Sequence, residues 1–133
     1  MSLAVSLMPI EIIQVNHVNV TVPAALESAA KHFYGVVLGL HEIPKPEGTR
    51  QNMGAWFDLG SSMQLHLSIE DGVANEMSDR HVCYQVADIA AADRHFREAG
   101  VEIIADRRPV RGQSRFFVRD PGGNMLEITQ RTE

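Results

Sequence analysis

Two histidines, a glutamine and a glutamate stand out because they fall at matching places in two similar stretches of the chain. His81 follows His17 by 64 residues, and Glu127 follows Gln64 by 63 residues. Imidazole nitrogen, carboxylate oxygen and amide oxygen suit a borderline divalent cation such as Zn, Ni, Co, Mn or Fe(II). If a pseudo-twofold axis relates the two stretches, the four side chains can converge on one ion. Glu127 would then bind ionised and both histidines as neutral imidazoles.

His66 lies two residues after Gln64, on the same face of a predicted strand. It could replace Gln64 as the fourth ligand, or it could contact a ligand without binding the metal itself. Both interpretations stay open. It is also the best candidate for a general base, because Glu127 is the only carboxylate on this face. The pattern therefore predicts Glu127 and His66 as catalytic residues.

These residues are positioned by an internal repeat. Residues 16–43 and 80–104 each open with a His-Val strand, continue through an Ala-rich stretch carrying His-Phe, and reach a glycine before another apolar pair. Alternation with period two predicts strands, and the glycines stand where helices end. The order βαβββ occurs twice, in modules of about residues 14–69 and 80–130, within one domain spanning residues 1–133. The predicted strands are 17–22, 41–43, 55–59, 63–69, 81–86, 101–105, 115–119 and 125–130, with helices at 24–38 and 89–99.

The predicted strands have one apolar and one polar face. The apolar face must pack against the helices, whereas the polar face collects His, Gln, Cys and Glu, which are typical of a pocket rather than of a solvated surface. Cys83 lies on the polar face, and we expect a small buried residue rather than a nucleophile. The cluster of Arg107, Arg108 and Arg111 is typical of a solvated loop, or alternatively could attract an anionic substrate.

Composition narrows the classes of partner. The chain has 133 residues, of which 44% are apolar, and a net charge of −5, which indicates one globular domain and disfavours nucleic acid. A single cysteine excludes an internal disulfide and indicates a reducing compartment. No apolar run approaches the ~18 residues of a membrane span, and residues 1–10 lack the basic start of a secretory signal. We therefore expect a cytoplasmic protein that binds a small molecule, with no nucleic-acid or membrane partner.

The chain resembles the vicinal oxygen chelate superfamily, which includes glyoxalase I, methylmalonyl-CoA epimerase, extradiol dioxygenases, fosfomycin-resistance enzymes and bleomycin-resistance proteins. The resemblance spans about residues 14–130, and it implies an α+β fold in which two βαβββ modules form an eight-stranded, cup-like open barrel with the helices outside. It also implies one divalent metal ion held by His17, His81 and Glu127, with Gln64 at a position that is Glu in glyoxalases and Gln in epimerases. A homodimer is implied, and in some members both chains complete the site. The motifs that carry the resemblance are His-Val at 17–18 and at 81–82, FYGVVLGL at 33–40, QLHL at 64–67 and FFVRDPGGNMLEI at 116–128.

The resemblance favours a lyase or isomerase of the glyoxalase/epimerase type, acting on a small metabolite that chelates the metal through vicinal oxygens. Phe117 stands where extradiol and fosfomycin enzymes usually carry Tyr, and Asn19 stands where fosfomycin enzymes tend to carry Thr. Gln64 cannot act as the base that Glu provides in glyoxalase I. The alternatives are a single-domain extradiol-type dioxygenase and a metal-free, drug-binding resistance protein of the bleomycin type. The retained ligand set argues against the latter.

Overall fold

The structure is a computed structural model that describes residues 6–50 and 53–131. Residues 1–5, the first half of the N-terminal segment that lacks the features of a secretory signal, lie outside the described residues. The chain folds as two modules of four strands each, with helical segments between the first and second strands. The elements are β1 (His17–Val22), η1 (Ala24–Leu26), α1 (Glu27–His32), η2 (Phe33–Val37), β2 (His41–Ile43), β3 (Ala55–Gly60), β4 (Met63–Ile69), η3 (Asn75–Met77), β5 (His81–Gln85), α2 (Ile89–Glu98), β6 (Ile104–Ala105), β7 (Gln113–Arg119) and β8 (Met125–Arg131).

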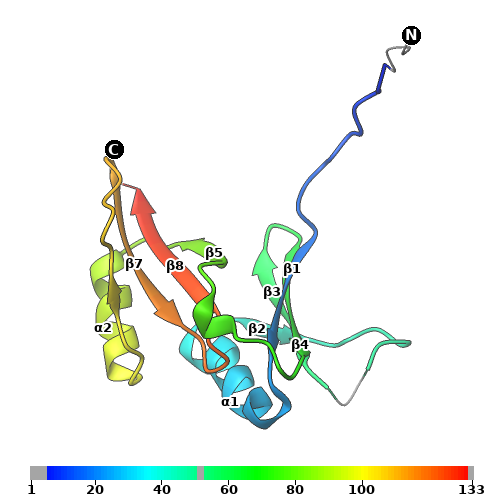
Figure 1. Cartoon of the computed structure of the whole chain (residues 1–133), viewed down its shortest axis with the longest axis horizontal. Coiled ribbons are helices and arrows are strands. Elements are labelled where there is room, and N and C mark those ends of the chain that lie inside the picture. The colour runs from blue at the N-terminus through cyan, green and yellow to red at the C-terminus, as the bar shows by residue number, and fades with distance from the viewer. Residues whose placement is uncertain (1–5, 51–52, 132–133) are drawn as a thin grey trace.

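The strand orders of the two sheets, β1-β4-β3-β2 and β5-β8-β7-β6, are equivalent. In each module the first strand runs parallel to the last, and the other pairs are antiparallel. This confirms the predicted α+β class with two βαβββ modules. The two sheets are separate, and in Figure 1 they diverge from α1. No helix in the described part of the chain has the length and apolar character of a membrane span.

The first helical region differs from the single helix predicted over 24–38. A 3-10 turn, the short helix α1 and the π-helix η2 follow one another. In η2 the amide of Leu38 donates to the carbonyl of Phe33 at 2.9 Å, which is the i→i+5 pattern of a wider turn. This turn brings Phe33, Tyr34 and Val37 into the core. Residue spacing alone does not separate such a segment from an ordinary helix.

The second helix follows the prediction more closely. The Asp88 side chain accepts a hydrogen bond from the amide of Ala91 and caps the N-terminus of α2. Gly100 adopts a φ of 77°, and the amide of Val101 donates to the carbonyl of Phe96 at 2.8 Å. In this C-terminal capping arrangement, the amide of Val101 is hydrogen-bonded to the helix and does not take part in a strand. Strand β6 is consequently shorter than the predicted 101–105.

One apolar core joins both modules. The predicted apolar face of the strands is confirmed where Leu65 and Leu126 lie at 0% and 2% exposure. Phe33 of the first module and Phe96 of the second stack with ring centroids 6.5 Å apart. The helical segments of the two modules therefore pack into one cluster, which fixes the modules relative to one another.

The turn between β7 and β8 fits tightly against β1. Buried Asp120 accepts hydrogen bonds from the Tyr34 hydroxyl at 2.6 Å and from the amides of Gly122 and Asn124 at 2.9 Å. Burial, followed by the charge of Asp120, raises the pKa of Tyr34 well above its usual value, so the hydroxyl remains a donor. A Cβ at Gly122 would lie 2.4 Å from Val22 Cγ1, so only glycine permits this approach.

Candidate functional site

The first group of predicted site residues lies on β1 and β4. His17 pairs in register with Gln64. The ring of His66 is stacked between those of His17 and Trp56, at centroid distances of 4.0 and 3.8 Å. His66 Nε2 lies 2.9 Å from Gln64 Oε1, and because an amide oxygen only accepts, Nε2 is the donor. We call His17, Trp56, Gln64 and His66 half-site A.

Half-site A favours the neutral imidazole of His66 and orients the ring of His17. Burial lowers the pKa of His66, and the nearby His17 and Lys45 lower it further. His17 Nδ1 lies 2.8 Å from the side-chain oxygen of Asn16, so Nδ1 carries the proton. This hydrogen bond orients the His17 ring and leaves Nε2 as the nitrogen that could bind a metal ion.

The second group lies on β5, β7 and β8, and its centre is the buried carboxylate of Glu127. His81 Nε2 and Arg115 Nη1 lie 3.3 and 3.5 Å from Glu127 Oε1, and Cys83 Sγ donates to Oε2 at 3.1 Å. His81 Nδ1 donates to the carbonyl of Asp79 at 2.8 Å, which orients the ring with Nε2 toward the carboxylate. We call His81, Cys83, Arg115 and Glu127 half-site B.

Cys83 corrects one expectation and agrees with another. It is exposed rather than buried, because the polar face of the edge strand β5 is open. Partial desolvation of the thiol, with the hydrogen bond to and charge of Glu127, raises its pKa to about 11. The thiol therefore stays protonated at neutral pH and acts as a donor to Glu127 rather than as a nucleophile.

Arg115 is a site residue that the sequence analysis missed. Its Nε donates to Asp106 Oδ2 at 2.9 Å, its Nη2 donates to the carbonyl of Arg108 at 2.7 Å, and its guanidinium lies 5.6 Å from the centre of the Phe117 ring. The signal was available, because Arg115 and Phe117 share a strand face and Phe117 pairs with Glu127. Arg107 and Arg108 line a cavity of about 210 Å³ with Arg115 and Phe117.

The two half-sites do not meet within one chain. Among residues 6–50 and 53–131, no three His, Cys, Asp or Glu side chains lie together in a way that could hold a metal ion. The structure thus brings His17 to Gln64 and His66, and separately His81 to Glu127, where convergence of all four was expected. The reason is the placement of the sheets, since β1 and β5 are edge strands of separate sheets that diverge (Figure 1).

Strand register also separates Gln64 from its expected counterpart. Glu127 lies opposite the third residue of β5. In the first module the residue opposite the third position of β1 is His66, whereas Gln64 lies opposite His17 at the first position. By strand register, Glu127 therefore corresponds to His66, whereas the repeat in the sequence pairs Glu127 with Gln64, two residues earlier. Gln64 and His66 both remain candidates for the ligand.

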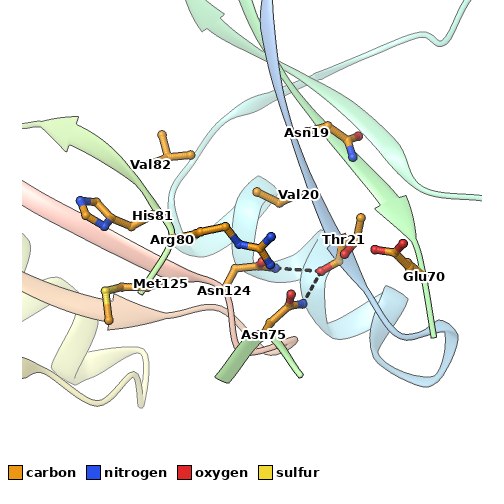
Figure 2. Close-up of a pocket in the computed structure, with 10 residues that line it drawn as sticks. All are labelled: Asn19, Val20, Thr21, Glu70, Asn75, Arg80, His81, Val82, Asn124 and Met125. Atoms are coloured by element: carbon orange, nitrogen blue, oxygen red, sulfur yellow. Dashed lines mark hydrogen bonds between the residues drawn. The ribbon is translucent and has the colours of Figure 1, made fainter. Parts of the chain in front are cut away.

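A polar cavity of about 310 Å³ lies where the sheets join. Figure 2 shows the side chains of Asn75 and Asn124 bonded to the carbonyl oxygen of Thr21, at 2.8 and 2.9 Å. His81 lines one wall of this cavity and Asn19 the opposite one. The end of β1 is thus tied to the start of β8 at the base of the space between the half-sites.

A second cavity, of about 370 Å³, lies beside Trp56 and His66 in the first module. Lys45 and Arg50 supply positive charge to its wall, and Lys45 Nζ donates to the carbonyls of Arg50 and Met53. Cavities with cationic walls thus adjoin both half-sites, a setting that favours an anionic group on a ligand.

Comparison with known proteins agrees with this geometry. A model of the Glyoxalase/Bleomycin resistance protein/Dioxygenase superfamily matches residues 14–128. A structure titled putative glyoxalase family protein, from Bacillus anthracis, is 32% identical, with a TM-score of 0.82 over 94% of this chain and 100% of that one. A glyoxalase/dioxygenase from Nostoc punctiforme is 24% identical, with a TM-score of 0.78 over 99% and 100%.

More distant structures share the fold. The fosfomycin resistance protein FosX from Listeria monocytogenes is 16% identical, with a TM-score of 0.74 over 92% of this chain and 94% of that one. A search of curated proteins finds no match. The match of the superfamily model over most of the sequence shows that this chain belongs to the Glyoxalase/Bleomycin resistance protein/Dioxygenase superfamily.

Proposed function

We propose that this protein is a divalent-metal-dependent enzyme of the lyase or isomerase type, acting on a small metabolite that chelates the metal through vicinal oxygens. The observation that carries the proposal is the division of the donors into two half-sites, each incomplete and each on the polar face of a sheet. Half-site A offers His17 with Gln64 or His66, and half-site B offers His81 and Glu127. Together they form a set of nitrogen and oxygen donors that fits Zn, Ni, Co, Mn or Fe(II).

The donor chemistry fits such an ion residue by residue. The Nδ1–H of His17 and of His81 each has an oxygen neighbour at 2.8 Å, which is the support that ligating histidines use. Glu127 provides the anionic ligand. When bound, the ion supplies Lewis-acid stabilisation of a substrate oxyanion.

We propose that the protein is a homodimer in which each site takes half-site A from one copy and half-site B from the other. A twofold axis makes every contact reciprocal, so two complete sites arise together. This arrangement accounts for two half-sites that diverge within one chain. In this site Glu127 would accept a proton from the carbon beside the chelating carbonyl, and Cys83 and Arg115 would hold its carboxylate in place. His66, stacked between two rings, would orient Gln64 through Nε2.

Metal analysis tests the chemistry. We expect about one Zn, Ni, Co, Mn or Fe per chain in gently purified protein, and we expect Glu127→Ala to lose it. Glu98→Ala, which removes an exposed carboxylate on α2, is the matched control and should keep the metal. Iron with oxygen uptake would replace the proposal by a ring-cleaving dioxygenase. Ligand binding without metal, even after reconstitution, would replace it by a resistance protein that sequesters a drug.

Mixed dimers test the sharing of sites. His17→Ala and Glu127→Ala chains, carrying different tags and refolded together, should form a dimer with one intact site and regain about one metal ion per dimer. A dimer of wild type with the double variant His17→Ala/Glu127→Ala should hold no complete site. If each chain supplied all of its own ligands, the two results would be reversed.

A further inference from the structure

Residues 6–16 form an extended, apolar arm that precedes β1. Figure 1 shows it leading away from both sheets. Six of its side chains are large and apolar, with exposures between 55% and 87%. Surfaces of this kind in soluble proteins mark places where another surface docks. The six residues are Leu7, Met8, Ile10, Ile12, Ile13 and Val15.

The composition of the arm favours a strand. Residues 10–15 are rich in β-branched side chains and contain neither Gly nor Pro. Ile12 and Ile13 are adjacent, so an extended arm has an apolar residue on each face, as in a strand covered on both sides. The base of the arm is held at the first sheet, where the Gln64 amide donates to the Asn16 carbonyl at 3.2 Å. The arm thus leaves the sheet in line with β1.

A matching surface lies at the free edge of β5. In the described residues β5 pairs with β8 on one side only. Beside the end of β5, a cavity of about 400 Å³ opens between this strand, α2 and the end of η2. Its wall is mostly apolar and includes Leu38, Leu40, Tyr84, Val86 and Phe96.

We propose that the arm of a second copy of this chain adds to the free edge of β5 and places an isoleucine in this cavity. The inference rests on the proposed sharing of sites, which puts His17 of one copy beside His81 of the other. Ile12 is five residues before His17, and Val86 is five residues after His81, so each lies about 17 Å along an extended chain from the shared ion. The arm runs toward the shared ion in chain direction, whereas β5 of the other copy runs away from it. The two segments are therefore antiparallel and can pair as strands.

A second copy is the occupant that the geometry favours. The arm points away from the core of its own chain (Figure 1), whereas β1 would carry it to the second sheet of a partner. By twofold symmetry, each arm then occupies the cavity of the other copy. The arm would close the dimer beside the site without supplying a ligand.

Dimer strength provides the first test. The triple variant Ile10→Ser/Ile12→Ser/Ile13→Ser should raise the dimer Kd at least about 10-fold in sedimentation velocity, since burial of apolar surface drives association. The control Val36→Ser/Met77→Ser changes two exposed apolar residues outside the arm, at 64% and 82% exposure, and should leave Kd unchanged. An unchanged Kd for the arm variant would overturn the proposal.

Disulfide trapping tests the location. In a Cys83→Ser background, chains carrying Ile13→Cys and chains carrying Gln85→Cys are mixed and oxidised. These two positions are four residues from His17 and His81, respectively, so they lie opposite each other in the proposed pairing, and a covalent heterodimer is expected. Chains carrying Met77→Cys replace the Gln85→Cys chains as the control and should not cross-link. If instead the double variant Ile13→Cys/Gln85→Cys forms only a bond within one chain, the arm docks on its own body and the proposal is wrong.

The two proposals fail in different ways. If mixed dimers of His17→Ala and Glu127→Ala regain metal while the arm variant dimerises normally, the shared site stands and the arm contact is wrong. If cross-linking succeeds but mixed dimers bind no metal, the arm contact stands and the shared metal site is wrong.

Discussion

The two half-sites are built from equivalent strands, yet different forces hold them. Half-site A is a stack of Trp56, His66 and His17 with an amide at its edge. Half-site B is an ionic group around Glu127 that Arg115 and His81 approach within 3.5 Å. Ring stacking orders the first half-site, whereas charge orders the second. Two copies of one unit can thus provide complementary halves of a cation site, with the anionic ligand in only one.

The turns before the last strands differ in the same way. Ser61 and Ser62 adopt positive φ values of 50° and 63°, a two-residue hairpin that is strained for non-glycine residues. In the second module, buried Asp120 organises the turn and binds Tyr34 of the first module. The first turn is therefore local, whereas the second holds the modules together.

The largest expected effect is at the second turn. Asp120→Ala removes the acceptor of several buried hydrogen bonds and should lower the free energy of unfolding by about 4 kcal/mol, measured by urea denaturation. Asp58→Ala is the matched change near the first turn, where one exposed carboxylate oxygen accepts the amide of Gly60. Asp58→Ala should lower the free energy of unfolding by less than about 1 kcal/mol. Equal costs would show that the turns do not differ in this way.

The next largest effect is expected on metal affinity, when the carboxylate is removed from half-site B or one is added to half-site A. Glu127→Gln should weaken Ni²⁺ or Zn²⁺ binding at least about 100-fold, because the anionic ligand is lost. Gln64→Glu should strengthen it by about 10-fold, because half-site A gains a carboxylate. Calorimetric titration measures both. Tighter binding by Glu127→Gln would contradict the assignment of the anionic ligand.

Breaking the ring stack should have a smaller effect. Trp56→Leu removes the ring that lies nearly parallel to His66, with 5° between the planes, and should cost about 1 kcal/mol of stability. Phe117→Leu is the comparison in half-site B, where the ring meets His81 edge-on at 6.0 Å. If stacking distinguishes half-site A, Trp56→Leu disturbs the NMR signals of His66 and His17 more than Phe117→Leu disturbs those of His81.

The pH dependence of stability tests whether His66 of half-site A is neutral. The pKa of His66 is lowered in the folded state, chiefly by burial, so the unfolded chain takes up a proton first as the pH falls. The contribution of neutral His66 to the free energy of unfolding is therefore complete above the ordinary histidine pKa of about 6.5. It is lost as the pH drops toward the lower pKa of His66 in the folded protein. The Tm of metal-free protein should fall less between pH 7 and pH 5 in His66→Phe than in wild type. An equal fall would show that His66 does not contribute.

The smallest expected effect is a gain at the first turn. Ser61→Gly relieves a positive φ and should raise stability by about 0.5 kcal/mol, seen as a small increase in Tm. The reference is Ser114→Gly, a change in β7 outside any turn, which should lower the Tm. A loss of stability on Ser61→Gly would mean that this turn is held by its serine side chains rather than tolerated by the backbone.

The repeat and the period-two pattern made most of the fold predictable. The bounds of β1 and β4 match the prediction because both strands have a regular polar and apolar alternation. The π-helix η2 and the short β6 were not predictable, since each depends on where single amides find acceptors. The same holds for the separation of His17 from His81, which depends on the packing of the modules. Arg115 was missed because its role comes from Glu127 across the sheet.

Trp56 is the only tryptophan in the chain, and its indole lies 3.8 Å from the ring of His66. All indole emission therefore originates in half-site A, in direct contact with a group whose protonation and orientation depend on what occupies the site. A protonated imidazole stacked on an excited indole withdraws an electron and quenches its light, whereas a neutral one does so far less. The protein thus carries its own optical reporter, and binding at this half-site can be followed by fluorescence without any added label.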